Sequence, residues 1–541
     1  MRKSVVVLVA MATVLLGACG ADPDIQQVGA GGPLASKVAI KTLDNVFGGA
    51  NQPDIRVAVG EKVQWENFGR NEHDIVPIDS KGWGVDAADF APGDTYSHTF
   101  DKPGVYSYYC SLHGTKTGGM RGRLLVGAVE AEPQVANTVP KQPSAPTGDV
   151  IKVPGDQPTI QKGVDAAKPG DLILVSPGVY KEAVEVPSAK SYITIRGVER
   201  NTTILDGEFK KANGIIVVKA KGVAIENMTA RNYTKNGFFW TGSTGYRGSY
   251  LTAFRNGDYG IYAFESTDGL MEHSYASGSP DAGFYIGGCQ PCNARINDVI
   301  SEWNGLGYSG TNSGGNLVIS NSTFRYNRAG IVPNSGSYEP KYPQDDNTIV
   351  GNLVYSNNNG KTPAIDISIT AMGNGILIAG GINNKIERNL VFDHDLGGIV
   401  IITYPEDAEW VWKATGNKVR DNVVSDSKLG DLGLWFGGSA TETGGNCFAG
   451  NTFETSAPKN IESQAPCEGQ RSGSMEDGAF DLIKLASNEG KPASVDYTKA
   501  ELPPVPKQPN MANPTTAPAA MAVNMPGPFD VDAVKLPKRP S

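Results

Sequence analysis

The chain has 541 residues, enough for at least two domains, and it contains 66 glycines but only 19% charged residues. This composition favours a turn-rich β protein over a helical one. The formal net charge of −9, and a sequence without a basic stripe carrying interleaved aromatic residues, argue against a protein that binds DNA or RNA.

The amino-terminal sequence predicts a targeting signal. A basic start precedes an apolar run from Val5 to Leu16, which is too short to span a membrane as a helix, and Gly-Ala-Cys19 follows. This order resembles the signals of bacterial lipoproteins. The resemblance implies removal of residues 1–18, lipidation of Cys19 and a flexible tether at residues 19–35; an ordinary cleaved signal with a chance cysteine is the alternative. We therefore expect a protein held to the bacterial membrane by its lipid, at the cell surface or in the periplasm.

The next residues are predicted to form β-strands. Val63–Asn67 alternates apolar and polar residues, as a half-buried strand does, and it leads through a polar loop to His73. Tyr96–Phe100 and Val105–Tyr109 are further strand-like runs, each bounded by a Pro-Gly turn. The second of them delivers Cys110 into a glycine-containing loop.

Four soft or borderline metal ligands are thereby expected at one strand end, namely His73, Cys110, His113 and Met120. A thiolate and two imidazoles with a weak axial thioether suit both oxidation states of copper, so such a blue-copper site passes single electrons with little rearrangement. The alternative is that Cys110 is a small buried hydrophobic residue and that both histidines are ordinary surface residues. His98, within a strand-like run, is interpreted as an outward-facing structural residue.

The Cys-x-x-His loop and its Tyr-x-Tyr-Tyr-Cys approach resemble the cupredoxins of the plastocyanin and pseudoazurin type. The resemblance implies a small Greek-key β-sandwich over residues 36–128 with one type 1 copper, and it implies that His113 is a partly exposed port for electrons. The six residues between His113 and Met120 exceed the loop length of plastocyanins. Another axial ligand would change the redox potential but would leave copper binding intact.

A linker at residues 129–148, rich in Pro, Ala, Thr and Val, is expected to be extended and semi-rigid. Beyond it, glycines followed by an apolar residue recur at steps of 23, 23, 23, 24 and 23, at Gly214, Gly237, Gly260, Gly283, Gly307 and Gly330. A fixed period of this length predicts stacked, similar units. Further on, Asn-x-apolar-x-x-Asn recurs at wider and irregular spacing, which indicates inserted loops, at Asn347/Asn352, Asn384/Asn389, Asn417/Asn422 and Asn446/Asn451.

Units of about 23 residues with β-branched and aromatic runs and Asn/Gly turns predict a parallel β-helix, with asparagines hydrogen-bonded along its axis. Thr159–Ala167, Pro169–Val175 and Pro177–Tyr180 resemble the start of right-handed parallel β-helix proteins of the pectin-lyase type. The resemblance implies such a solenoid over residues 149–468, capped by a short amphipathic helix. The predicted fold class is therefore all-β, a cupredoxin Greek-key β-sandwich followed by a right-handed parallel β-helix.

One column of the solenoid is a candidate carbohydrate platform. The second residue after the repeating glycine should face outward. Phe239, Tyr262 and Tyr285 occupy this position in consecutive units, and neighbouring coils lie about 4.8 Å apart, so the three rings would form a ladder. An aromatic ladder can stack on sugar rings, or another part of the protein can cover it.

A second column, two residues before the repeating glycines, contains Lys235, Asp258, Asp281 and, after a gap, Arg328. Stacked carboxylates can bind a divalent ion such as calcium or act as acid and base in catalysis. The alternative interpretation is that all four are solvated turn residues.

Four further cysteines are expected to form disulfides in an oxidising compartment, Cys289 with Cys292 and Cys447 with Cys467. The first pair could instead be a redox couple or half of a metal site, whereas the second would close the end of the solenoid. The tail, residues 469–541, is rich in Pro, Ala, Asn and Met and lacks a core of its own, so it is expected to wrap or to dangle.

Three functions are consistent with these patterns. The leading hypothesis is a lipid-anchored one-electron carrier whose β-helix is a scaffold that docks a redox partner protein or a cell-envelope polysaccharide. The alternative is a polysaccharide lyase, epimerase or hydrolase of the β-helix type with an accessory copper domain, so whether the chain is an enzyme stays open. A third hypothesis, a copper donor, comes from the resemblance to β-helix proteins that help mature copper enzymes such as nitrous-oxide reductase.

Overall fold

The computed structural model describes residues 38–48, 54–79, 81–130, 138–407, 409–439 and 441–540. The predicted signal peptide (residues 1–18), Cys19 and the predicted tether (residues 19–35) all lie outside the described residues. The chain divides into two compact units. The first is the N-terminal unit up to residue 136 with the short segments Ser337–Pro340 and Pro405–Val411, and the second is the remainder.

The N-terminal unit is built from two four-stranded sheets. Its elements are β1 (Val38–Leu43), β2 (Val46–Phe47), β3 (Ile55–Val57), β4 (Lys62–Asn67), β5 (Val76–Pro77), η1 (Ala87–Asp89), β6 (Thr95–Thr99), β7 (Gly104–Gly114) and β8 (Gly119–Val126). The strand orders are β2-β1-β4-β6 and β3-β8-β7-β5, with β1–β4 and β3–β8 parallel and the other pairs antiparallel. The predicted β-sandwich is confirmed.

An aromatic core joins the two sheets. Trp65 on β4 and Tyr108 on β7 are fully buried, with their ring centroids 5.6 Å apart in an edge-on contact. His98 on β6 packs against Phe100, with centroids 4.8 Å apart, and burial lowers the pKa of His98. His98 is half-buried in this aromatic packing, which agrees with a structural role, but it does not face outward as expected, because it pairs with the buried Val63.

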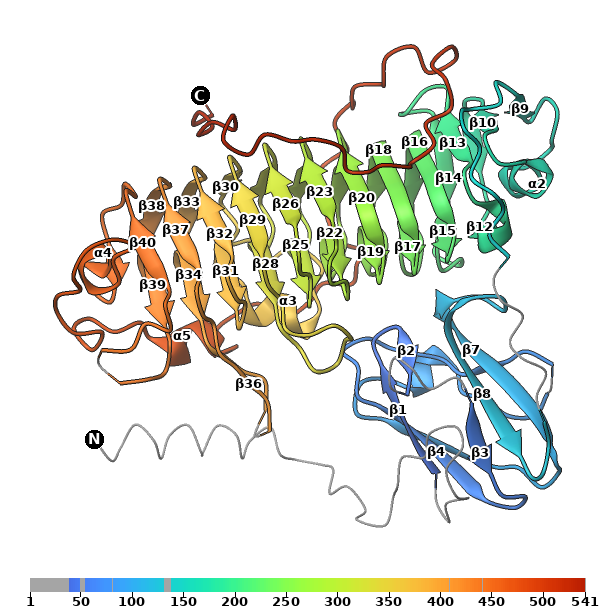
Figure 1. The fold of residues 1–541 in the computed structure, drawn as a ribbon, viewed down its shortest axis with the longest axis horizontal. Coiled ribbons are helices and arrows are strands. Elements are labelled where there is room, and N and C mark those ends of the chain that lie inside the picture. Colours follow the sequence, from blue (N-terminus) through green and yellow to red (C-terminus); the bar gives the residue numbers. More distant parts are fainter. Residues whose placement is uncertain are drawn as a thin grey trace. The chain divides into compact units, whose positions relative to one another are not determined.

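The second unit is a solenoid with three walls, whose strands stack side by side in Figure 1. The first two walls share the long strands β16 (Lys221–Arg231) and β18 (Thr244–Phe254). The first wall also contains β9 (Val150–Val153), β10 (Leu172–Val175), β13 (Thr194–Gly197), β20 (Thr267–Glu272), β23 (Ala294–Asn297), β26 (Leu317–Ser320), β29 (Asn347–Val350), β32 (Lys385–Glu387), β37 (Lys418–Arg420) and β40 (Cys447–Ala449).

The other two walls follow the same parallel stacking. The second contains β11 (Gly178–Tyr180), β14 (Thr203–Asp206), β21 (Tyr275–Ser277), β24 (Ile300–Glu302), β27 (Thr323–Arg325), β30 (Leu353–Tyr355), β33 (Leu390–His394) and β38 (Val423–Ser427). The third contains β12 (Val184–Pro187), β15 (Ile215–Val218), β17 (Phe238–Thr241), β19 (Tyr259–Phe264), β22 (Ala282–Gly287), β25 (Leu306–Thr311), β28 (Ala329–Asn334), β31 (Ile376–Ala379), β34 (Gly397–Ile402), β39 (Gly430–Trp435) and β41 (Ser456–Ala457). A separate two-stranded sheet pairs β35 (Tyr404–Pro405) with β36 (Val411–Trp412).

The 23-residue period sets the register of the third wall. The residues that follow the repeating glycines align in neighbouring coils and are buried together in the interior, at Ile215, Phe238, Ile261, Phe284, Tyr308 and Ile331. The predicted asparagine ladders also form. Asn384 donates to the Asn417 amide oxygen at 2.8 Å, and Asn417 donates to that of Asn446 at 2.8 Å. The parallel β-helix is therefore confirmed.

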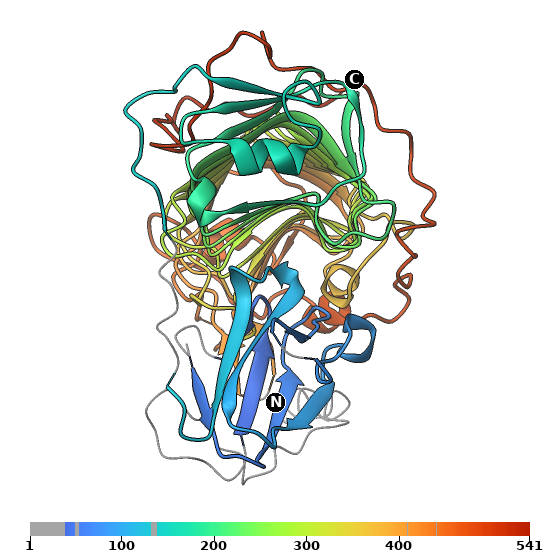
Figure 2. The ribbon, with the colours of Figure 1, turned by 90° about the vertical axis from the view of Figure 1, so that its right-hand side faces the viewer.

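Both ends of the solenoid are closed. Helix α2 (Ile160–Ala166) begins after Thr159, whose hydroxyl caps the Lys162 N–H at 3.1 Å, and the helix crosses the first coils in Figure 2. At the other end lie α4 (Ile461–Gln464) and the Cys447–Cys467 disulfide. The Cys289–Cys292 disulfide is also formed, so both predicted pairings are confirmed.

The C-terminal segment wraps along the solenoid and contains α5 (Leu482–Ala486). A further helix, α3 (Asp366–Thr370), lies in an inserted loop. Beyond α5 the segment is extended, and arginines of the coils donate hydrogen bonds to its carbonyl groups. These bonds join Arg255 to Ala500 (2.8 Å), Arg196 to Ala517 (2.7 Å), Arg295 to Pro526 (2.9 Å) and Arg388 to Val531 (3.0 Å). Within the described part of the chain, none of the helices has both the length and the hydrophobicity that a membrane span requires.

Candidate metal centre

Three candidate ligands meet at one end of the β-sandwich. His73 lies on the loop between β4 and β5, whereas Cys110 and His113 lie on β7. The Cys110 Sγ is 3.7 Å from the His73 Nδ1 and 3.5 Å from the His113 Nδ1, and the two Nδ1 atoms are 3.1 Å apart. All three side chains are fully buried, and their ligand atoms lie within 4.8 Å of one another. A thiolate and two imidazole nitrogens this close together can bind one copper ion.

The strand β7 differs from its prediction, because it does not end at Tyr109 but continues through the ligands to Gly114. Its pairing with β8 is irregular between Tyr109 and Gly114, and Gly114 then pairs with Gly119. The six residues between His113 and Met120 thus form a β-hairpin that returns the chain to the site. Met120 is the second residue of β8 and its side chain is only 1% exposed. The expected axial ligand therefore lies beside β7, the strand that carries His113.

The exposure expected for His113 is wrong. The side chain has no exposed surface. His113 lies on the paired strand β7, next to the hairpin that leads to the buried Met120, and not in an open loop. The expectation of a partly exposed electron port rested only on the resemblance to plastocyanins.

Two buried carboxylates that the sequence analysis did not single out lie against the ligands. The Asp44 Oδ1 is 3.3 Å from the His73 Nε2. Asp74 accepts hydrogen bonds from the backbone N–H of Ser111, at 2.6 Å, and from the Ser111 hydroxyl. Asp74 follows His73 in the sequence and was open to detection, but only the parallel pairing of β1 with β4 brings Asp44 to the site.

The surroundings of the Cys110 thiol disfavour its charged, thiolate form. Burial, and after it the negative charge of Asp74, raises the pKa of the Cys110 thiol. Without metal the thiol is therefore protonated at neutral pH. Copper binds the thiolate, so metal uptake releases this proton.

Lys235, Asp258 and Asp281 stack in consecutive coils, as the sequence repeat predicted. They are not solvated turn residues. Asp258 N–H donates to the Lys235 carbonyl at 3.1 Å, and Asp281 N–H donates to the Asp258 carbonyl at 3.2 Å, so these residues stack in consecutive coils. All three are buried. The Tyr259 hydroxyl donates to the Asp281 carboxylate at 2.5 Å, and burial together with the two aspartates raises the pKa of Tyr259.

Arg328 is a structural anchor. Its guanidinium is buried and donates to the carbonyl groups of Gly360, Thr362, Pro492 and Ala493. Burial lowers the pKa of Arg328 to about 10. These contacts hold an inserted loop and the C-terminal segment, and they correct the interpretation of Arg328 as a solvated turn residue.

The aromatic column is formed but covered. Phe239 pairs in register with Tyr262, and Tyr262 with Tyr285, with ring centroids 4.4 and 4.8 Å apart. All three rings are buried, in an apolar cluster on the outer side of the third wall to which Phe480 and Leu485 of the C-terminal segment also belong. Of the two interpretations, the covered ladder describes this structure and the open stacking platform does not, because the ladder is itself part of a second core.

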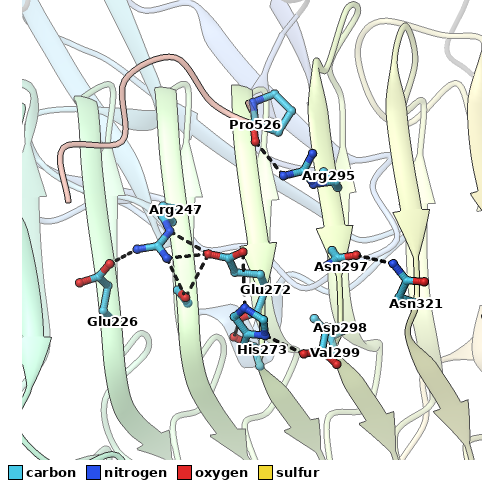
Figure 3. A network of polar contacts seen from close by, with 12 residues as sticks. Glu226, Arg247, Glu272, His273, Arg295, Asn297, Asp298, Val299, Asn321 and Pro526 are labelled. Atoms are coloured by element: carbon cyan, nitrogen blue, oxygen red, sulfur yellow. Dashed lines mark hydrogen bonds and ion pairs between the residues drawn. The ribbon is translucent and has the colours of Figure 1, made fainter. Parts of the chain in front are cut away.

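A charged network that the sequence analysis missed follows the first wall, as Figure 3 shows. Arg247 lies between Glu226 and Glu272, with an N–O distance of 2.6 Å to the latter, and the His273 Nδ1 is 2.6 Å from an Asp298 carboxylate oxygen. These residues come from successive coils and form no local motif, so they could not be recognised as a network from the sequence. Arg196 also pairs with Glu226, so opposite charges alternate from Arg196 through Glu226 and Arg247 to Glu272 along the wall.

Known proteins resemble the two units separately. Residues 46–127 match the model for copper binding proteins of the plastocyanin/azurin family, and residues 193–361 and 236–409 match that for a right handed beta helix region. The plastocyanin of Rumex obtusifolius is 39% identical over 80 residues, which span 13% of this chain and 79% of that protein.

Two solved structures illustrate the similarity. The novel purple cupredoxin from Nitrosopumilus maritimus is 26% identical, with a TM-score of 0.13, and the match covers 15% of this chain and 86% of that one. The A-module of a mannuronan C-5 epimerase from Azotobacter vinelandii is 14% identical, with a TM-score of 0.44, and the match covers 60% and 97% of the two chains.

Proposed function

We propose that this chain, which belongs to the plastocyanin/azurin family of copper-binding proteins through residues 46–127, is a one-electron carrier with a single type 1 copper. The observation that carries the proposal is the buried cluster of the Cys110 Sγ and the Nδ1 atoms of His73 and His113. Copper in such a site supplies a reversible one-electron couple.

The ligand residues have distinct roles in this proposal. Cys110, His73 and His113 hold the metal, and Met120 adjusts the redox potential as a weak axial ligand. The loop that carries His73 is rigid, since Asn67 donates to the carbonyl groups of Asn71, at 2.9 Å, and of Phe90, at 3.0 Å. A buried, rigid ligand set excludes water and changes little between oxidation states, which favours fast electron transfer.

The β-helix is proposed to be a scaffold that docks a redox partner protein or an envelope polysaccharide, in a protein anchored outside the cytoplasm by a lipid on Cys19. Burial of the aromatic column and of Asp258 and Asp281 supports a scaffold over a polysaccharide-active enzyme. A donor of copper to another protein would use the same site, and it would differ from a carrier by losing its metal to an apo-acceptor.

The test uses the whole mature chain with Cys19→Ser, to avoid lipidation, loaded with Cu(II). We expect one copper per chain and an intense visible thiolate-to-copper band. Cys110→Ser should abolish the band, whereas the double variant Cys289→Ser/Cys292→Ser, a control that replaces two disulfide-bonded cysteines, should retain it. A band that persists in Cys110→Ser would overturn the assignment.

A further inference from the structure

Asp44 is a buried carboxylate in contact with a candidate copper ligand. We propose that Asp44 is a positioning residue of the copper centre, which fixes the orientation of His73 and biases the bound metal toward Cu(II). The inference rests on the proposed copper function and deepens it.

The carboxylate organises the loop that carries His73. Its Oδ1 accepts from the backbone N–H groups of Arg70, at 2.9 Å, and Asn71, at 3.1 Å, and lies 3.3 Å from the His73 Nε2. The Asp44 side chain is 2% exposed. Among the residues that the structure describes, His73 is the only side chain that forms an ion-pair contact with Asp44. The carboxylate therefore has its negative charge directed at the ligand.

The backbone is shaped to permit this approach. A Cβ atom at Gly69 would lie 2.3 Å from the Asp44 Oδ1 and 3.0 Å from the His73 Nε2. Any other residue would displace the carboxylate or the ring. Gly69 also donates its N–H to the Asn67 amide oxygen at 2.9 Å, which fixes the turn.

The contact determines which nitrogen of His73 is available to the metal. A carboxylate accepts a hydrogen bond, so the imidazole places its proton on Nε2 and leaves the Nδ1 lone pair facing Cys110 and His113. A carboxylate on the far side of a ligating imidazole also raises the basicity of the ligand. Greater electron donation and a fixed negative charge stabilise Cu(II) more than Cu(I), so the reduction potential falls.

The main test compares copper-loaded full-length chains that carry Asp44→Asn or the control Asp101→Asn. Both remove one negative charge, but Asp101 is exposed and precedes β7, whose start at Gly104 is about 20 Å along the strand from Cys110. We expect Asp44→Asn to weaken Cu(II) binding about tenfold relative to Cu(I). This change equals a rise of about 59 mV in the one-electron potential. Asp101→Asn should leave the potential unchanged.

A second measurement needs no variant. In the Cu(I)-loaded wild-type chain, nitrogen-15 NMR of the histidines should show a proton on the His73 Nε2 and metal bound at Nδ1. A wild-type chain that turns blue, but whose potential is unchanged in Asp44→Asn or whose His73 binds copper through Nε2, would overturn the inference and leave the proposed function intact. A wild-type chain without a blue band would overturn both.

Discussion

Asp74 braces the residue that follows the candidate copper thiolate, since its carboxylate accepts hydrogen bonds from the N–H of Ser111, at 2.6 Å, and from the Ser111 hydroxyl. This brace ties the loop of His73 to the strand of Cys110. The two halves of the metal site, which are 37 residues apart in the chain, are therefore connected through a direct side-chain contact.

Removal of this brace should weaken copper binding. We expect Asp74→Ala to reduce the Cu(II) affinity by about 10- to 100-fold. The reason is that Ser111, next to Cys110 on β7, loses the buried carboxylate that accepts its hydrogen bonds. Asp74→Asn, which retains an oxygen that can accept the Ser111 N–H, should lose less. Competition with a chelator measures both affinities, and equal affinities for wild type and Asp74→Ala would contradict the role.

The axial position should set the potential without holding the metal. Met120→Leu conserves side-chain volume, so we expect the free energy of unfolding to change by less than about 1.5 kcal/mol. Copper should remain at one per chain, while loss of the thioether sulfur, a weak donor to Cu(II), raises the reduction potential. Voltammetry and metal analysis measure the two quantities, and loss of copper from Met120→Leu would show that Met120 anchors the metal.

The asparagine ladder should stabilise the solenoid. The Asn389 amide oxygen accepts from the N–H and the side chain of Asn352, and its Nδ2 donates to the Ile349 carbonyl and to Asn422. Asn389→Ala leaves several of these buried groups unpaired, so we expect a loss of about 3 kcal/mol in the free energy of unfolding. The control Asn358→Ala, which removes only hydrogen bonds at the surface, should cost less than about 1 kcal/mol. Urea unfolding measures both variants.

The stability of the solenoid should depend on pH through His394. Burial lowers the pKa of this histidine on β33 to about 3, whereas an unfolded histidine has a pKa near 6.5. The unfolded chain therefore takes up a proton first, and stability is lost as the pH falls from 6.5 toward 3. At pH 5 the loss is about 2 kcal/mol. In His394→Gln this part of the pH dependence should be missing; unchanged acid sensitivity of the variant would contradict it.

The sequence predicted what depends on period and local pattern. The 23-residue repeat was sufficient for the third wall and its interior residues, and the Asn-x-apolar-x-x-Asn pattern was sufficient for the ladders. Asp44 could not be found, because the pairing of β1 with β4 decides its contact with His73. Burial of Tyr262 was equally inaccessible, since the alternation of side chains shows which residues face outward but not which segment covers them. The sequence of the C-terminal segment also contains no pattern that predicts its route. Arginines of the coils hold this segment by donating hydrogen bonds to its backbone carbonyl groups, which every residue has.

The burial of the acidic and aromatic columns leads to a prediction about carbohydrate chemistry. When the copper-loaded chain is incubated with acidic and neutral polysaccharides, we expect no cleavage and no epimerisation, because Asp258 and Asp281 are 2% and 4% exposed and the ring of Tyr262 is covered. Binding without product would support a polysaccharide-docked carrier, and the absence of binding would support docking to a protein. Product that disappears in Asp258→Asn or Asp281→Asn, but persists in the exposed control Asp298→Asn, would contradict the scaffold role. The acidic column would then have to become accessible in solution, and the copper centre would be accessory to an enzyme.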